Sequence, residues 1–263
     1  MKQLYRKPRR GIIHLEVRSG LCNRLRSLVS GICLAEDLNS FLVVYWPSSK
    51  KSCQAAFSDL YELSSLPRWV MIIDRSYSRN SVDGMKVIEC RSQEEALTAA
   101  AGKHLISSNT YFHSSDITRR RRHLQQLLPK QFLLARVWVN HQKLPKGLIP
   151  VGVHVRRTDN IGAIEQSPLS GFESAMQKIT NAYFFVASDD EQAAGYLMRK
   201  FPGRTYCQET VRKRDSVEGI QEALVSLYTL ALCSRILGSY YSSFSTMSGE
   251  LRFVEVITIL KTT

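Results

Sequence analysis

The segment Val151-Gly-Val-His-Val-Arg-Arg-Thr-Asp159 decides the fold, because a run of apolar residues in it ends directly in a charged cluster. Its first five residues are dominated by valine, which predicts a buried β-strand. In open α/β sheets, ligands bind beyond the carboxyl ends of the parallel strands. The two arginines after the strand therefore stand where an anionic ligand is expected.

Strand-like and helix-like segments alternate along the rest of the chain, which predicts an α/β architecture with parallel sheets. The expected strands cover residues 11–17, 41–45, 69–73, 86–88, 151–155, 182–187, a short stretch near 205, and 236–239. The expected helices cover residues 24–39, 93–101, 170–179, 191–200, 217–233 and a closing segment from about 246.

A proline and a glycine interrupt this pattern at residues 143–147, KLPKG, which indicates a boundary. The break predicts an N-terminal domain of residues 1–145 and a C-terminal domain of residues 146–263. Each would be a Rossmann-like half, and two such halves that face each other would leave a cleft between them.

The composition is typical of a folded, water-soluble protein, with 44% hydrophobic and 22% charged residues in a chain of 263. No apolar run reaches the roughly 18 residues of a membrane span, and the basic N-terminus lacks the features of a signal peptide. A cytoplasmic location is therefore expected. The six cysteines form no C-x-x-C pair, so we expect small buried side chains rather than disulfides or a zinc site.

The formal net charge of +13 suits nucleic acid, anionic surfaces or phosphorylated ligands. The densest basic block runs from Arg119 to Arg122 and is followed by leucines at positions 124, 127 and 128. This spacing favours the solvated face of an amphipathic helix. A patch that binds anions or nucleic acid is the alternative, although no recognised nucleic-acid module accompanies the charge.

Arg156 and Arg157 are neighbours on an irregular strand end, so their side chains cannot both point the same way. One could bind a diphosphate in a bidentate manner, while the other is held by Asp159 or lines the cleft. A cluster of surface salt bridges is the structural alternative.

Residues 184–190, FFVASDD, form a second apolar strand that ends in acids. One carboxylate could accept hydrogen bonds from a guanine edge or a ribose, and an acidic pair could also hold a divalent ion with a diphosphate. Asp189 or Asp190 could equally cap the helix that follows. The pattern favours a cap for one acid and a ligand contact for the other.

Two further segments combine a turn with a helix start. Residues 237–246 contain Ser242, Ser243 and Ser245, and such a turn could cradle a phosphate without a metal ion. A simple capping box is the alternative for this turn. Residues 18–26, RSGLCNRLR, contain Gly20, which could let the backbone approach a ligand closely.

Taken in order, these four segments resemble the GDP-fucose-dependent fucosyltransferases, which have two Rossmann-like halves in the GT-B arrangement. That group includes α1,6-fucosyltransferases and, more distantly, protein O-fucosyltransferases. The segment VGVHVRRTD is similar to the α1,6-fucosyltransferase donor motif nearly letter for letter. FFVASDD and the SSFS turn resemble the next two motifs, and GLCNRLR resembles the N-terminal glycine loop. The resemblance spans residues 11–250. It implies that residues 1–145 form the acceptor-side domain and that residues 146–263 form the domain that binds the donor.

The resemblance implies a role for each matched residue. Arg156 resembles the arginine that holds the donor β-phosphate and stabilises the departing GDP, and Arg157 would aid it. The other donor-binding residues that the resemblance implies are His154 and Asp190 for the guanosine part, Ser242, Ser243 and Ser245 for the phosphates, and Asn23 in the N-terminal loop.

The implied reaction is inverting transfer of fucose from GDP-fucose to a hydroxyl of a glycan or other acceptor, without a metal ion or a cofactor. Glu165 is the predicted general base, with Asp159 as the second choice. Three positions depart from the family pattern, namely Asn160, Ile164 and Ser226. They motivate one alternative, a non-catalytic member that binds a nucleotide-sugar, and the basic charge motivates another, a nucleic-acid-binding protein.

Overall fold

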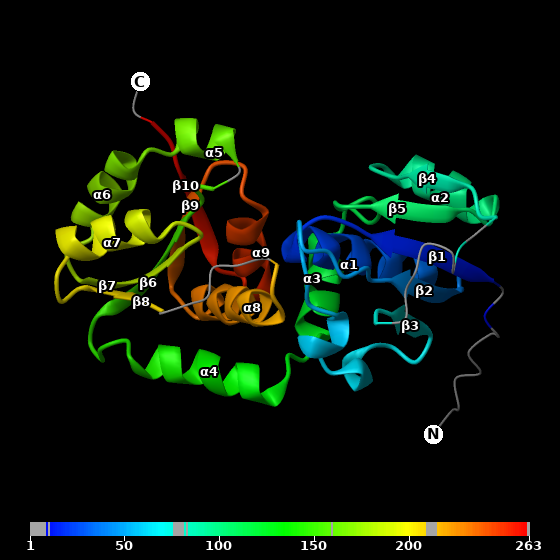
Figure 1. Ribbon diagram of the computed structural model, residues 1–263, viewed down its shortest axis with the longest axis horizontal. Helices are drawn as coiled ribbons and strands as arrows, with labels where there is room; N and C mark the ends of the chain where they lie inside the picture. Colours follow the sequence, from blue (N-terminus) through cyan, green and yellow to red (C-terminus); the bar gives the residue numbers. More distant parts are fainter. Residues whose placement is uncertain are drawn as a thin grey trace. The chain divides into compact units, whose positions relative to one another are not determined.

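The computed structural model describes residues 9, 11–75, 82, 84–158, 160–208 and 215–261, which form two compact units (Figure 1). Unit 1 is Met1–Leu128 and unit 2 is Pro129–Thr263. Each unit contains a five-stranded sheet, and every pairing between its named strands is parallel. Helices connect most consecutive strands, so the predicted α/β fold is confirmed.

The sheet of unit 1 has the strand order β3-β2-β1-β5-β4, with the first strand of the chain at its centre. The described elements of this unit are β1 (Ile12–Val17), α1 (Leu21–Asp37), β2 (Phe41–Tyr45), the short 3-10 helices η1 (Phe57–Asp59) and η2 (Leu63–Ser65), β3 (Val70–Ile73), β4 (Val87–Glu89), α2 (Gln93–Ala101), β5 (Leu105–Ser108) and α3 (Ile117–Gln126).

The sheet of unit 2 has the strand order β10-β9-β6-β7-β8, which is the doubly wound order of a Rossmann-like half. Its described elements are α4 (Gln131–Gln142), β6 (Ile149–Val155), α5 (Ile161–Gln166), α6 (Leu169–Gln177), β7 (Ala182–Ser188), α7 (Glu191–Lys200), β8 (Thr205–Cys207), α8 (Val217–Ala231), β9 (Arg235–Ser239), α9 (Ser243–Arg252) and β10 (Glu255–Ile259).

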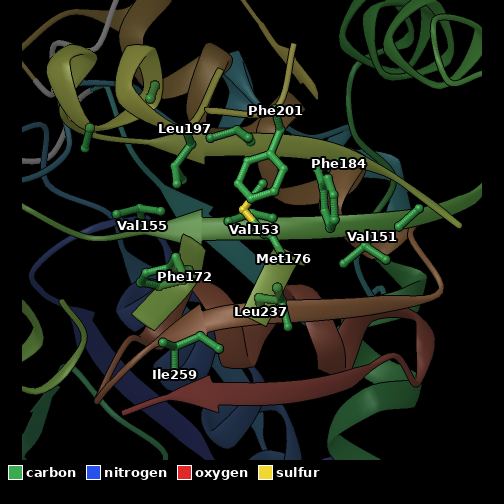
Figure 2. Packing of buried hydrophobic residues seen from close by; sticks show 14 residues of the cluster. Val151, Val153, Val155, Phe172, Met176, Phe184, Leu197, Phe201, Leu237 and Ile259 are labelled. Atoms are coloured by element: carbon green, nitrogen blue, oxygen red, sulfur yellow. The ribbon is translucent and has the colours of Figure 1, made fainter. Parts of the chain in front are cut away.

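Both faces of the second sheet are covered by helices, and the alternation of side chains along β6 explains how. Val151, Val153 and Val155 point to the face where α6 and α7 pack, together with residues such as Phe172 (Figure 2). Residue 152 and His154 point to the opposite face, where α8 and α9 lie. A central strand buried on both sides requires a nearly continuous apolar run, which is what this segment has.

The division between the units falls between Leu128 and Pro129, earlier than the predicted boundary after residue 145. The intervening helix α4 packs against α8 of unit 2, and Asn140 links them because its side-chain amide donates to Thr229 Oγ1 at 3.3 Å. A hydrogen bond between residues that are far apart in the sequence cannot be recognised from the sequence near either residue. The proline and glycine in residues 143–147 are recognisable locally, and the predicted boundary was therefore placed there.

Two of the elements that the sequence pattern missed are short or atypical. β5 contains two serines and no alternation, α5 has six residues, and the prediction also omitted α4 and β10. The prediction of α9 as the closing element is therefore wrong, because β10 follows it and pairs with β9. Residues 21–23, predicted as part of a tight loop, form the first turn of α1 instead.

The basic block on α3 is only partly a solvated face. Arg122 is exposed as expected, but Arg119 lies against α1, where its guanidinium pairs with Glu36 at 2.9 Å and Asp37 at 2.7 Å. The two acids also accept from His123 and His113, respectively. One charge of the block thus stabilises the packing of α3 on α1 rather than facing solvent.

All six cysteines are free, and five of them are buried, which confirms the expected role as small apolar side chains. Within the described part of the chain, none of the helices combines the length and the apolar character that crossing a membrane requires.

Two helical glycines give a matched test of the packing in unit 2. A Cβ atom on Gly249 of α9 would lie 2.7 Å from the backbone oxygen of Val254, whereas one on Gly195 of α7 would meet only the flexible end of Arg199. We expect Gly249→Ala to destabilise the protein by about 1–3 kcal/mol through overpacking. Gly195→Ala should stabilise it by about 0.5–1 kcal/mol, because alanine favours the helix. Urea unfolding of both variants measures this, and equal effects would contradict the close approach of α9 to the loop after it.

Candidate functional site

The carboxyl ends of β6 and β9 lie side by side at the point where the strand order of the second sheet reverses. From β6 the chain continues outward through β7 and β8 on one side, whereas β9 and β10 occupy the other side. The connections after β6 and β9 therefore leave in opposite directions, and ligands bind at such switch points in sheets of this kind. The candidate site is built around this point.

Asp189, at the end of β7, fixes the conformation of the chain after β6. Its carboxylate accepts hydrogen bonds from the backbone N–H of Arg157 at 2.7 Å and from the hydroxyl of Thr158 at 2.7 Å. The same carboxylate pairs with the Nη1 atom of Arg156 at 2.7 Å. A single acid thus holds three consecutive residues of the predicted donor motif.

Arg156 is anchored at both its backbone and its guanidinium. Its backbone N–H donates to the hydroxyl of Ser239 at 2.9 Å, and that hydroxyl donates to the carbonyl of His154 at 3.2 Å. The side chain is 19% exposed and its partner Asp189 is 17% exposed. A guanidinium that is held in a largely desolvated position interacts more strongly with an anion than one in bulk water.

His154 lies beneath the arginine and is buried against the start of α9. Its Nδ1 atom is 2.8 Å from the hydroxyl of Ser245, and its ring stacks on Phe244 with centroids 4.6 Å apart. Burial lowers the pKa of His154 to about 4; the negative charge of Asp189 opposes this shift and the positive charge of Arg156 adds to it. The imidazole is therefore neutral at pH 7.

The turn between β9 and α9 provides backbone donors beside this histidine. Ser242 caps α9, because its hydroxyl accepts the N–H of Ser245 at 3.4 Å. Among the described residues, no acceptor is found for the N–H groups of Ser243 and Phe244 in the same turn. A Cβ atom on Gly238 would lie 2.7 Å from the Ser245 side chain, so the glycine is what lets Ser245 reach His154.

Two of the predicted donor-binding residues have structural partners. The guanidinium of Arg157 donates to the carbonyls of Ile164 at 3.1 Å and Ser167 at 2.7 Å, and burial lowers its pKa. Asp190 caps α7 by accepting the N–H of Ala193 at 2.8 Å. One acid of the FFVASDD segment is thus a cap, as expected, whereas its neighbour Asp189 holds the arginines.

The predicted base and the N-terminal residue take no part in the contacts described above. Glu165 is exposed on the short helix α5, which begins shortly after Arg157, and Asp159 lies outside the described residues. Asn23 is half-buried in the first turn of α1 in unit 1. Gly20 before it has φ −73° and ψ 169°, a conformation open to any residue, so the backbone conformation alone does not require glycine there.

Sequence reasoning missed the anchoring role of Ser239 and the backbone conformation of Tyr241. Ser239 lies at the end of a predicted strand, but its link between β6 and β9 becomes visible only when the two strands are paired. Tyr241 has φ 49° and an 86% exposed side chain, and Asn160 donates to its carbonyl at 3.4 Å. A left-handed backbone is costly for a residue other than glycine and often marks a functional turn.

Comparison with solved structures identifies the fold. NodZ α-1,6-fucosyltransferase co-crystallized with GDP is similar over 96% of this chain and 95% of that chain, with a TM-score of 0.66 and 18% sequence identity. Fucosyltransferase NodZ from Bradyrhizobium matches over 96% of both chains, with a TM-score of 0.62 and 17% identity. POFUT1 in complex with GDP-fucose matches over 97% of this chain and 99% of that chain, with a TM-score of 0.61 and 12% identity.

The chain has the fold of these fucosyltransferases. The architecture that the resemblance implied is thereby confirmed. No protein-family model and no curated protein sequence matches the chain, so the likeness lies in the arrangement of the elements. In the described part of the molecule, no group of three or more His, Cys, Asp or Glu side chains is placed to hold a metal ion.

The buried His154 predicts a pH dependence of stability. The unfolded chain binds a proton at this residue near pH 6.5, whereas the folded protein binds it only near pH 4. Between these values the unfolded state holds more protons, so the free energy of unfolding falls as the pH falls, by on the order of 3 kcal/mol in total.

Urea unfolding between pH 7 and pH 4 measures this, with His154→Asn as the reference that keeps a hydrogen-bonding group beside Ser245. Other titrating groups are common to both proteins, so the difference in stability between them should shrink as the pH falls. A difference that stays constant with pH would show that the folded state accommodates a charged imidazole.

Proposed function

We propose that this protein is an inverting, metal-independent glycosyltransferase that moves fucose from GDP-fucose to a hydroxyl group of a glycan or other acceptor. The observation that carries the proposal is the anchored guanidinium of Arg156 at the switch point of a Rossmann-like sheet. Structures of similar fold have been obtained with GDP and with GDP-fucose, which supports a nucleotide-sugar as the ligand.

In the proposed reaction the acceptor oxygen attacks the anomeric carbon of fucose, and the bond from that carbon to the diphosphate breaks. The leaving GDP gains negative charge, which Arg156 and the N–H groups of Ser243 and Phe244 neutralise. These donors are fixed before the reaction because Asp189 and the cap at Ser242 hold their surroundings. Fixed donors in a partly desolvated site can take the place of a metal ion.

The remaining donor-binding roles follow from position. His154, being neutral, offers a ring nitrogen to the nucleoside without adding charge, and Ser245 orients that ring. We assign Arg157 and Asp190 to the walls of the guanosine pocket, although each also has a structural partner. Asn23 is assigned to the donor from the side of the N-terminal unit.

The proton of the acceptor hydroxyl would pass to a carboxylate. Glu165 is the proposed base because it is exposed on α5, the element that follows the donor motif, and an exposed carboxylate is accessible to an incoming acceptor. Asp159 is the second choice, from its place in the motif.

One observation favours a second candidate function, a protein that binds the nucleotide-sugar without transferring it. No described contact fixes the Glu165 side chain, whereas a general base is usually positioned by its neighbours. Stabilisation by GDP together with no donor hydrolysis and no transfer to any glycan would favour this candidate.

Arg156→Ala should lower turnover by about 10²–10³-fold, because it removes the group that stabilises the departing diphosphate. GDP affinity, measured by calorimetry, should fall as well. Arg199→Ala is the control, since Arg199 is exposed on α7 and the same charge is lost. Equal activity in the two variants would rule out the assigned role of Arg156.

Chelation tests the absence of a metal requirement. Because arginine and backbone donors neutralise the diphosphate in the proposed mechanism, EDTA should leave the rate of fucose transfer and the affinity for GDP unchanged. Loss of transfer on chelation, restored by Mg²⁺ or Mn²⁺, would replace this mechanism by a metal-assisted one.

Glu165→Gln should reduce the maximal rate by about 10²–10⁴-fold while leaving GDP affinity unchanged, because a general base contributes about that much to a rate. Glu191→Gln, at an exposed position at the start of α7, is the matched control. If Glu165→Gln retains the wild-type rate, the base is another group, and Asp159→Asn is the next variant to measure.

A further inference from the structure

The starts of α1 and α3 place two arginines against one tyrosine in unit 1. The guanidinium of Arg26 lies 5.5 Å from the centroid of the Tyr111 ring, and that of Arg120 lies 4.3 Å from it. α1 follows β1, and Tyr111 follows β5 closely. The cluster therefore stands at the carboxyl ends of two paired strands between which the order of this sheet reverses, a position where open α/β sheets bind ligands.

No carboxylate balances either arginine within the described residues. Arg26 has no hydrogen bond or ion pair there, and Arg120 donates only to a backbone carbonyl, that of Ser114, at 2.6 Å. The Nε atoms of both side chains are buried without an acceptor. A buried donor without an acceptor is unfavourable, and no carboxylate of the described chain pairs with either side chain.

The neighbouring Arg119, unlike Arg120, is paired with carboxylates. It belongs to the same basic block and the same helix, yet Glu36 and Asp37 of α1 pair with its guanidinium. A general excess of positive charge on α3 would leave all of these arginines in solvent. Instead, Arg119 is neutralised by acids, whereas Arg120 lies over an aromatic ring and pairs with no described carboxylate.

We propose that Arg26 and Arg120, stacked on Tyr111, form a binding subsite for an oxyanion, that is, a sulfate, phosphate or carboxylate group of a second substrate. The planar guanidinium matches such groups in a bidentate manner. Stacking on the tyrosine ring fixes the orientation of both guanidinium groups before the ligand arrives. The assignment of this group to the acceptor rests on the proposed function, and it makes the acceptor an acidic glycan or glycoconjugate.

The test uses the full chain saturated with GDP, so that the donor site is occupied, and inorganic sulfate as the probe at constant ionic strength. Calorimetry should show saturable sulfate binding that Arg26→Gln and Arg120→Gln each weaken by about tenfold or more, since each removes a charged hydrogen-bond donor. Arg122→Gln is the matched control on α3, because Arg122 is exposed and the same charge is lost. It should change the affinity by less than about twofold.

Unchanged affinity in the two glutamine variants would overturn the subsite, and so would an equal loss in Arg122→Gln, which would indicate a diffuse basic surface. Arg26→Lys and Arg120→Lys keep the charge but lose the planar fork. They should bind sulfate with intermediate affinity, and they serve in place of a glutamine variant that does not fold.

Competition identifies the anionic group. Glucose 6-sulfate, glucose 6-phosphate and glucuronate are titrated against bound sulfate. The competitor that binds most tightly shows whether the anionic group of the substrate is a sulfate, a phosphate or a carboxylate. If none displaces sulfate, the assignment to a sugar substrate is wrong. A wild-type protein that binds sulfate in this way but does not bind GDP would overturn the proposed function and leave the subsite standing, so the two failures are distinguishable.

Discussion

The candidate site depends on the hydrogen bonds and the ion pair that the carboxylate of Asp189 makes. By accepting from the backbone of Arg157, from Thr158 and from the guanidinium of Arg156, it turns an irregular strand end into a fixed structure. A guanidinium that already has its bound orientation loses little conformational entropy when a ligand arrives. The serine at the end of β9 completes the arrangement from the other side. Three strands of one sheet thus cooperate to hold a single positive charge in place.

Much of this fold could be predicted from local patterns. β2, α2 and α7 occupy the residues expected, because their apolar spacing and their caps are encoded within the element itself. The fourth helix and the last strand were not predicted, because what stabilises them is contact with α8 and with β9, elements distant in sequence. The observed boundary between the units differs from the predicted one for the same reason, because α4 packs on α8 and so belongs to unit 2. A proline and a glycine can interrupt a pattern without ending a domain.

In the candidate site, too, some residues could be predicted from local sequence and others could not. Arg156 could be proposed from the sequence because it directly follows a buried strand, and His154, within that strand, because it belongs to the segment that resembles the family motif. The partners that hold them, Asp189 and Ser239, come from neighbouring strands, and only the register of the parallel sheet brings them within hydrogen-bonding distance. In addition, the basic block on α3 could not be divided by inspection into a paired arginine and a stacked one, because the acids that make the difference lie on α1.

The neutrality of His154 has a consequence for how acid and base act on this protein. An imidazole shielded between the sheet and α9 carries no charge throughout the neutral range, so the electrostatic potential around β6 stays constant there. If the protein catalyses the proposed transfer, changes in its rate between mildly acidic and mildly alkaline solutions must then originate in other ionisable groups, such as an exposed carboxylate or the substrates. The pH dependence of the proposed reaction would then report the titration of those other groups without a contribution from His154.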